Sequence, residues 1–193
     1  MKIFISGGCK NGKSYYAQHY TICNAHRLGK AQQPCPLYYI ATMRPIDTED
    51  DKRIARHRRE REGWGFTTIE QPVDIEKITD TCDASGSFLL DSLTALLMNE
   101  MFLQGNRVNE YAAEKIIAGL VHITSTINNI VVVSDYIYSD AILYNPLTEK
   151  YRESLAKIDR TAAENCDIVL ETAFTNIIVH KGKEIRSVYE TIP

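Results

Sequence analysis

The sequence has few of the features that mark a secreted, zinc-binding or membrane-inserted protein. Its five cysteines are scattered and include no C-x-x-C pair, so neither a zinc site nor a thioredoxin-like motif is indicated. Reduced thiols in the cytosol are the simplest interpretation. No apolar stretch approaches the roughly 18 residues that are needed to cross a bilayer. We therefore expect no membrane span.

The N-terminal stretch MKIFISGG also lacks the long apolar core and the small-residue cleavage site of a signal peptide. No internal repeat, low-complexity segment or linker divides the chain. Hydrophobic residues make up 44% and charged residues 24%, which is the profile of an ordinary globular protein. We expect one cytoplasmic domain over residues 1–193, because this length is sufficient for a substantial core.

A strong excess of charge of one sign is absent as well. The formal net charge is −3, so the surface as a whole does not attract polyanions, and we expect no binding to nucleic acid. A local basic run stands out against this background, RIARHRRERE at residues 53–62, with five arginines around one histidine. Such a cluster is compatible with a small anionic ligand.

Short apolar segments rich in β-branched residues alternate with helical patterns. We expect strands at 2–6, 36–42, 87–92, 129–135 and 167–172, and an antiparallel edge strand at 176–182. Helices are expected at 13–26, 47–62 (with Asp47 as N-cap), 93–104, 109–127 and 148–166. Strands that are apolar throughout are buried on both faces, as in a parallel sheet. The pattern predicts an α/β fold with a mostly parallel β-sheet flanked by helices and a C-terminal antiparallel edge hairpin.

The strongest motif is GGCKNGKS at residues 7–14, which fits G-x-x-x-x-G-K-S and predicts a P-loop NTPase-like sheet. It follows an expected strand and opens an expected helix, where backbone amides and the helix N-terminus attract phosphates. Lys13 is expected to reach the β- and γ-phosphates, and the Ser14 hydroxyl to ligate magnesium. The expected nucleotide-binding residues here are Gly7, Gly8, Cys9, Lys10, Asn11, Gly12, Lys13 and Ser14.

A P-loop site also needs a carboxylate at the end of a neighbouring strand, near the magnesium shell. Asp91 ends the apolar segment FLLD and fits this role. It also fits as the N-cap of the helix that follows, and the two roles are compatible.

The basic run allows two interpretations. On a helix, Arg53, His57 and Arg61 are four residues apart and share one face. Neighbouring cations lower the pKa of an imidazole, which keeps it neutral, and they attract phosphates. A neutral His57 that attacks an α-phosphate would give a covalent nucleotidyl-histidine. From spacing alone, a solvated surface histidine is the simpler interpretation.

The order of these motifs resembles the bifunctional adenosylcobinamide kinase / adenosylcobinamide-phosphate guanylyltransferase family of cobalamin biosynthesis. That family has an N-terminal P-loop, a strand ending in Y-I-A-T, an acidic helix start leading into R-I-x-x-H-r-x-x-R, and then an aromatic residue and T-x-E. This chain has GGCKNGKS, YIATMRPIDTEDDKRIARHRRER and WGFTTIEQP in that order and at similar spacing. The resemblance is specific over residues 1 to about 103 and looser beyond.

The resemblance implies that His57 is the guanylylated nucleophile. It implies further nucleotide contacts at Ala41, Thr42, Met43, Arg58, Arg59, Glu60, Arg61, Glu70 and Asp91. It also implies a P-loop α/β domain that assembles as a homotrimer. The implied substrates are ATP and GTP, with magnesium, and a corrinoid, either adenosylcobinamide or its phosphate.

The second half of the chain departs from the family pattern. After the fourth expected strand the family has an asparagine–glutamate pair, whereas this chain has Asp135 in place of the asparagine. Further on, Asp159 and Arg160 replace an asparagine–glutamine pair. These changes concern the acceptor, and they leave two other functions open. One is a P-loop small-molecule kinase without guanylyltransferase activity, and the other is a non-catalytic nucleotide-binding protein.

Overall fold

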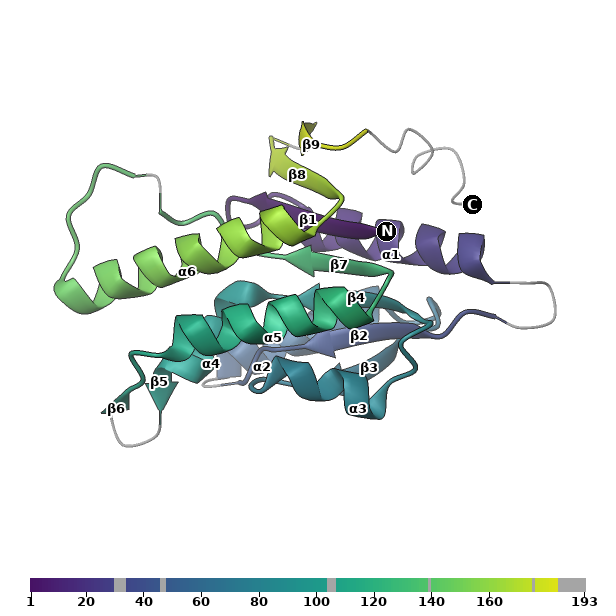
Figure 1. The fold of residues 1–193 in the computed structure, drawn as a ribbon, viewed down its shortest axis with the longest axis horizontal. Coiled ribbons are helices and arrows are strands. Elements are labelled where there is room, and N and C mark those ends of the chain that lie inside the picture. The colour runs from purple at the N-terminus through teal and green to yellow at the C-terminus, as the bar shows by residue number, and fades with distance from the viewer. Residues whose placement is uncertain (30–33, 46–47, 104–106, 139, 175, 184–193) are drawn as a thin grey trace.

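A seven-stranded sheet forms the centre of the protein (Figure 1). The computed structural model describes residues 1–29, 34–45, 48–103, 107–138, 140–174 and 176–183, and for residues 50, 51, 53, 57 and 60 it describes the backbone alone. The spatial order of the strands is β3-β2-β4-β7-β1-β8-β9. Their bounds are β1 Lys2–Gly7, β2 Leu37–Ala41, β3 Thr67–Glu70, β4 Ser87–Asp91, β7 Ile130–Val133, β8 Ile168–Ala173 and β9 Asn176–Lys181. All neighbouring pairs are parallel except β8 and β9, which are antiparallel.

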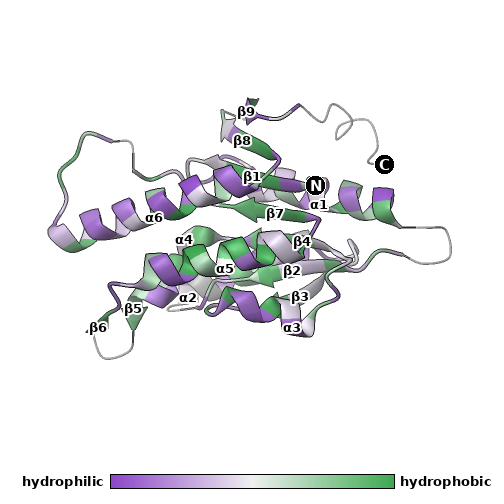
Figure 2. Cartoon of the chain, viewed as in Figure 1, coloured by the Kyte–Doolittle hydropathy of each residue, from purple (hydrophilic) through white to green (hydrophobic). Residues whose placement is uncertain are grey.

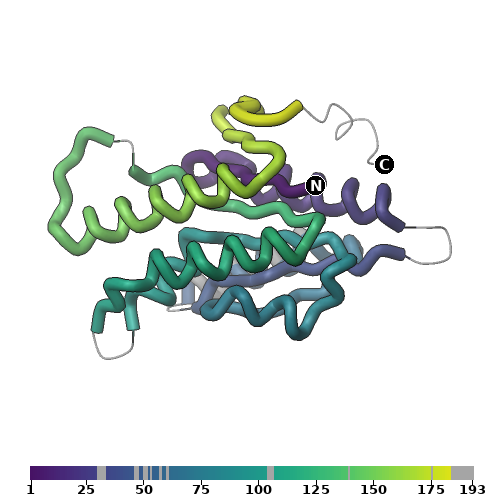
Figure 3. The backbone as a smooth tube through the Cα atoms, viewed as in Figure 1, coloured from purple at the N-terminus to yellow at the C-terminus, as the bar shows by residue number. Residues whose placement is uncertain are grey.

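Helices connect the parallel strands and cover both faces of the sheet. They are α1 Lys13–Leu28, α2 Thr48–Glu60, α3 Ile78–Thr81, α4 Leu93–Met101, α5 Ala112–Thr126 and α6 Pro146–Asn165, with a 3-10 helix η1 at Ile75–Lys77. A short antiparallel pair, β5 Phe102–Leu103 and β6 Arg107–Val108, follows α4. Helices α5 and α6 pack side by side on one face of the sheet (Figures 1 and 3).

The core has two layers because successive side chains of a strand point to opposite faces. In β1, Ile3 and Ile5 pack with Tyr16 and Tyr20 of α1. Phe4, between them, belongs to the larger cluster formed with α4, α5 and α6. The strands at the centre are accordingly mostly hydrophobic, whereas the exposed side of α6 is hydrophilic (Figure 2). Burial on both faces is the physical reason for the near-continuous apolar strand segments in the sequence.

The predicted fold class is confirmed, as are the expected strands, the five longer helices and the antiparallel edge hairpin. Two expectations differ from the structure. The helix expected over 93–104 ends at Met101, because Phe102 enters the β5–β6 hairpin. Strand β3 was not predicted, since its sequence TTIE is mostly exposed at the sheet edge and gives no apolar run. The expected N-cap Asp47 lies outside the described residues.

None of the helices in the described ranges has the length and apolar character that spanning a membrane requires.

Gly119 permits close packing between α5 and η1. A Cβ at this position would lie 2.7 Å from Cγ2 of Ile75, which is fully buried and β-branched and therefore moves aside only at a cost. Alanine favours a helix by about 1 kcal/mol over glycine, but overpacking a core costs about 1–3 kcal/mol.

We therefore expect Gly119→Ala to lower the free energy of unfolding by about 1 kcal/mol in urea titrations, because overpacking outweighs helix propensity. In an Ile75→Ala background, which removes the opposing methyl group, the same change should be neutral or stabilising. A stabilising effect of Gly119→Ala in the otherwise unchanged protein would contradict this account of the contact.

Candidate functional site

The loop between β1 and α1 lies closely against β8. A Cβ added to Gly7 would lie 2.5 Å from the carbonyl oxygen of Thr172, and Asn11 Nδ2 donates to that same oxygen at 3.3 Å. Gly12, the last residue before α1, has a φ of 83°, a left-handed conformation that favours glycine. Two glycines of the predicted P-loop are thus required by the path of the backbone.

The N-terminus of α1 carries a partial positive charge that its own sequence does not offset. Among the described residues no side chain caps this end, and the first turn of the helix contains no acidic residue. The backbone N–H groups and the dipole at such an end attract phosphate groups. The geometry therefore suits the predicted phosphate-binding role of this loop.

Lys13, the predicted phosphate ligand, is folded over the loop. Its side chain is 6% exposed, and Nζ donates to the carbonyl oxygen of Gly8 at 2.6 Å. The same Nζ forms an ion pair with Asp135 Oδ1 at 2.8 Å. Asp135 follows β7, which is the neighbour of β1 in the sheet. In the sequence, Asp135 stands out only as a departure from the family pattern, although it also comes after an apolar strand.

Asp91 lies at the end of β4, on the other side of β7 from the P-loop strand. Its Oδ2 accepts a hydrogen bond of 2.9 Å from the hydroxyl of Tyr39 on β2. The N-cap of α4 is Ser92, whose Oγ accepts from the backbone N–H of Ala95 at 3.4 Å. The interpretation of Asp91 as the N-cap is therefore wrong, and its carboxylate belongs to the edge where the parallel strands end.

Thr42 ties the end of β2 to the end of β4. It is fully buried, and its Oγ1 donates to the carbonyl oxygen of Ser92 and accepts from the N–H of Ser92, both at 2.8 Å. Its own carbonyl accepts from Asn99 Nδ2 at 2.7 Å. Of the three residues expected to line the nucleotide after β2, Thr42 thus has a structural role, while Ala41 and Met43 are half-buried on either side of it.

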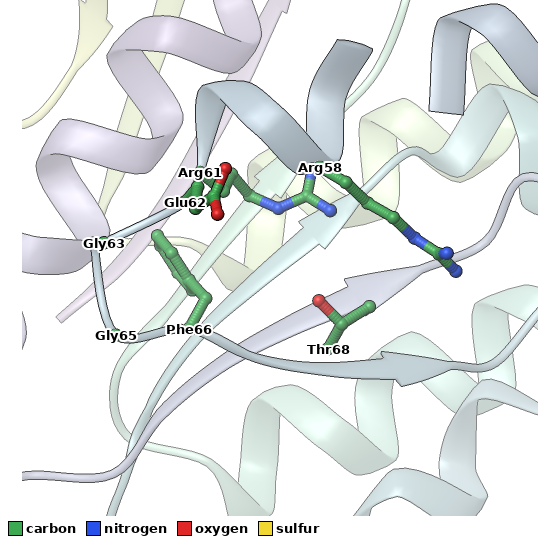
Figure 4. A pocket seen from close by; sticks show the side chains of 7 residues that line it. All are labelled: Arg58, Arg61, Glu62, Gly63, Gly65, Phe66 and Thr68. Atoms are coloured by element: carbon green, nitrogen blue, oxygen red, sulfur yellow. The ribbon is translucent and has the colours of Figure 1, made fainter. Parts of the chain in front are cut away.

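A hollow of about 450 Å³ opens beside the C-terminal end of α2 (Figure 4). Arg58, one of its lining residues, pairs with Glu70 Oε1 at 2.7 Å, and both side chains are exposed. Arg59 is exposed and does not line the hollow. The lining residues are Arg58, Arg61, Glu62, Gly63, Gly65, Phe66 and Thr68.

The side chains of two predicted site residues, His57 and Glu60, lie outside the described part of the chain. The structure places their backbone in α2. His57 directly precedes Arg58, and Glu60 directly precedes Arg61, so the helix brings both positions to the end that borders the hollow.

Arg61 links this hollow to Asp91. The arginine is 7% exposed, and its guanidinium carbon lies 3.5 Å from the centre of the Tyr39 ring, a cation–π contact. Because the Tyr39 hydroxyl donates to Asp91, Tyr39 contacts both Arg61, just after α2, and Asp91, at the end of β4. Sequence analysis missed Tyr39, since an aromatic residue in an apolar strand is usually a core residue.

Asp159 on α6 is a buried carboxyl group close to the same edge. It is 3% exposed, and its Oδ2 accepts from the hydroxyl of Tyr138 at 3.0 Å. Burial raises the pKa of Asp159 to about 7, and the negative charge of Asp135 adds to this effect, while the hydrogen bond from Tyr138 opposes it. At acidic pH the carboxyl group is therefore neutral in the folded protein.

The raised pKa makes stability depend on pH. The folded state holds this proton up to about pH 7, whereas the unfolded state releases it near pH 3.8, so the stabilising contribution of the neutral form is lost as pH rises between these values. One pKa unit corresponds to about 1.4 kcal/mol. Between pH 5 and pH 8, the free energy of unfolding of the wild type thus falls by roughly 2–3 kcal/mol relative to that of a variant with a permanently neutral side chain at position 159.

We expect Asp159→Asn to be more stable than the wild type at pH 8. The free energy of unfolding of the variant minus that of the wild type should be roughly 2–3 kcal/mol larger at pH 8 than at pH 5. Urea unfolding of both proteins at each pH measures this difference. Asp80→Asn, at an exposed position of α3, should show no such dependence. An equal difference at both pH values for Asp159→Asn would contradict the burial of a titrating carboxyl group.

Comparison with solved structures shows the fold. A KaiC-like protein from Pyrococcus horikoshii is similar with a TM-score of 0.53 and 14% identity, over 95% of this chain and 79% of that one. A second structure from the same organism has a TM-score of 0.44 and 9% identity, over 96% of this chain and 88% of that one. Among curated proteins none matches this chain.

A protein-family model described as cobinamide kinase / cobinamide phosphate guanyltransferase matches residues 3–175. The match includes the P-loop, the basic helix, the hollow and the segment that carries Asp135 and Asp159. With these elements all inside the matched range, the chain belongs to the cobinamide kinase / cobinamide phosphate guanyltransferase family, which consists of nucleotide-dependent transferases of cobalamin biosynthesis.

Proposed function

We propose that this protein performs both reactions of its family within one domain of residues 1–193. It phosphorylates adenosylcobinamide with ATP or GTP, and it then transfers GMP from GTP to adenosylcobinamide phosphate. The observation that carries this proposal is the presence of two different phosphate-attracting places, namely the P-loop and the arginine-lined hollow. Tyr39 links Arg61 of the hollow to Asp91, the carboxylate at the end of β4.

In the first reaction the P-loop residues 7–14 hold the triphosphate. Its phosphates would occupy the positively charged start of α1, and Lys13 would exchange its partners Gly8 and Asp135 for the β- and γ-phosphates. The hydroxyl of the aminopropanol arm of adenosylcobinamide receives the γ-phosphoryl group. Catalysis then consists of positioning and of charge stabilisation.

Magnesium is expected to accompany the triphosphate. In nucleotide sites this ion takes one or two protein ligands and completes its shell with waters and phosphate oxygens. Ser14 at the start of α1 and Asp91, which Tyr39 orients, are a hydroxyl and a carboxylate of the required kind. Within the described ranges no group of three or more potential ligands holds a metal by itself. We propose that Ser14 and Asp91 hold the ion together with the phosphates, whose charge it neutralises.

In the second reaction a ring nitrogen of His57 attacks the α-phosphorus of GTP. The bond from this phosphorus to the α–β bridging oxygen breaks, pyrophosphate leaves, and a phosphoramidate forms. A phosphate oxygen of adenosylcobinamide phosphate then attacks the same phosphorus and releases the histidine, which gives adenosylcobinamide-GDP. Arg58 and Arg61 line the adjacent hollow, and Glu70 pairs with Arg58. Their charges would support binding of the GTP phosphates there.

We further propose that the protein assembles as a homotrimer. Light scattering at several protein concentrations would measure its mass.

Incubation with α-labelled GTP and magnesium, followed by denaturation, tests the histidine intermediate. We expect acid-labile, alkali-stable label on the wild type and none on His57→Asn, because asparagine offers no nucleophilic nitrogen. His26→Asn, at an exposed position near the end of α1, is the control and should label as the wild type does. Label that persists on His57→Asn would remove this residue from the mechanism.

Tyr39→Phe tests the role of Asp91 in holding magnesium. Loss of the hydroxyl removes the hydrogen bond that orients the Asp91 carboxylate, and partners of this kind typically contribute 10–100-fold in metal affinity. We expect the magnesium concentration for half-maximal phosphorylation to rise about 10-fold. Tyr38→Phe, on the same strand but with its hydroxyl bonded to the N–H of Asp83, should leave it unchanged. Equal magnesium requirements of Tyr39→Phe and the wild type would argue against this role.

A P-loop small-molecule kinase without guanylyltransferase activity is the second candidate. The arrangement at the P-loop favours it, because Lys13 and Asp135, a cation and a carboxylate suited to phosphoryl transfer, already meet there, and that reaction does not need the hollow. Transfer of γ-phosphate without any histidine label would support this candidate. GTP binding without either activity would point to a non-catalytic nucleotide-binding protein.

A further inference from the structure

Asp135 is fixed against the P-loop by backbone hydrogen bonds on both sides of it in the sequence. The N–H of Ser134 donates to the carbonyl oxygen of Ile5 at 3.0 Å, and the N–H of Tyr136 donates to that of Gly7 at 2.9 Å. The β7–β1 pairing thus continues beyond the end of β7, and Asp135 lies beside the first glycine of the P-loop. Its own N–H donates to Thr94 Oγ1 of α4 at 2.9 Å. Its backbone is therefore held from two elements.

The carboxylate of Asp135 is fixed but accessible. It is 24% exposed, and it pairs with Lys13, which is almost completely buried. The negative charge of Asp135 acts on Asp159 and Tyr151, both on α6. Neither of these two groups supplies a positive charge, whereas the ion pair with Lys13 compensates Asp135.

Binding of a triphosphate changes this arrangement. Lys13 is the residue that reaches the β- and γ-phosphates in a P-loop, and its Nζ lies 2.8 Å from Asp135 Oδ1. The backbone of Asp135 is held beside Gly7 of the P-loop, so a γ-phosphoryl group bound at this loop lies near the Asp135 carboxylate after Lys13 has turned to the phosphates. Two anions at this distance repel each other unless a hydrogen-bond donor lies between them. Asp91 and Ser14 are the residues proposed for magnesium, so the donor that remains is the hydroxyl of the acceptor.

We propose that Asp135 is the general base of phosphoryl transfer in this protein. Its carboxylate accepts the proton of the acceptor hydroxyl while the hydroxyl oxygen bonds to the γ-phosphorus. The bond from that phosphorus to the β–γ bridging oxygen breaks, and the nucleoside diphosphate leaves with the electron pair. Asp135 afterwards releases the proton to water. This inference rests on the proposed kinase function.

The asparagine of the resembled family supplies a matched variant. An amide has nearly the shape of a carboxylate, and it can orient a hydroxyl but cannot take its proton at neutral pH. Asp135→Asn thus removes the base and retains the shape of the side chain. It also removes the ion pair with Lys13, so nucleotide binding should become tighter while catalysis becomes slower.

The test is transfer of labelled γ-phosphate from ATP to cobinamide by the full-length protein with magnesium. We expect Asp135→Asn to lower kcat by about 10²–10⁴-fold, the usual contribution of a general base, and to leave KM for ATP unchanged or lower. The kcat of the wild type should fall at acidic pH as the base becomes protonated, and Asp135→Asn should lack this fall. Asp135→Glu, which retains a carboxylate, should have a higher kcat than Asp135→Asn and keep the acidic fall.

Each result has one meaning. If Asp135→Asn has the kcat of the wild type, with or without a changed KM, then Asp135 only holds Lys13 and is not the general base. If Asp135→Asn has a lower kcat but keeps the same pH dependence as the wild type, this result would also overturn the assignment. Label on His57 from α-labelled GTP, together with an unchanged unfolding midpoint, shows that a slow variant is folded. A wild type without γ-phosphate transfer to cobinamide would overturn the proposed kinase function and the base with it.

Discussion

The parallel alignment of β1, β7 and β4 is the constraint on which the site depends. Parallel strands end at the same edge of a sheet, so the side chains that follow each of them meet there. Lys13 comes shortly after β1, Asp135 is the second residue after β7, and Asp91 ends β4. The Lys13–Asp135 ion pair is a direct product of this alignment, since β7 lies between the other two strands. A change in strand order would separate these groups, even with every motif intact.

Tyr39 connects the arginine-lined hollow with the edge where the parallel strands end. One face of its ring receives the Arg61 guanidinium, and its hydroxyl orients Asp91. A ligand that draws Arg61 into the hollow would weaken the stacking, and this would act on the carboxylate proposed for magnesium. The two proposed reactions would benefit from neighbouring sites, because the product of the first reaction would be the acceptor of the second.

Much of this arrangement was predictable from local sequence. The P-loop motif fixed the strand–loop–helix unit around Lys13, since its glycines are needed for backbone conformations that other residues rarely adopt. Asp91 was found from its place after an apolar strand. The same rule applied to IVVVSD would have identified Asp135, and its pairing with Lys13 was hidden only by their separation of 122 positions in the sequence. Strand β3 and the end of α4 were missed because exposed edges and short hairpins leave no apolar periodicity.

The sequence by itself determined the fold class, the phosphate loop and the family resemblance, because apolar periodicity and glycine-rich turns act over short distances along the chain. Only the tertiary structure decided which charges meet. It paired Lys13 with Asp135, placed Tyr39 between Arg61 and Asp91, and buried Asp159 so that its pKa rises. These outcomes depend on strand order and burial, which arise from contacts between residues far apart in the chain, and no local pattern encodes them.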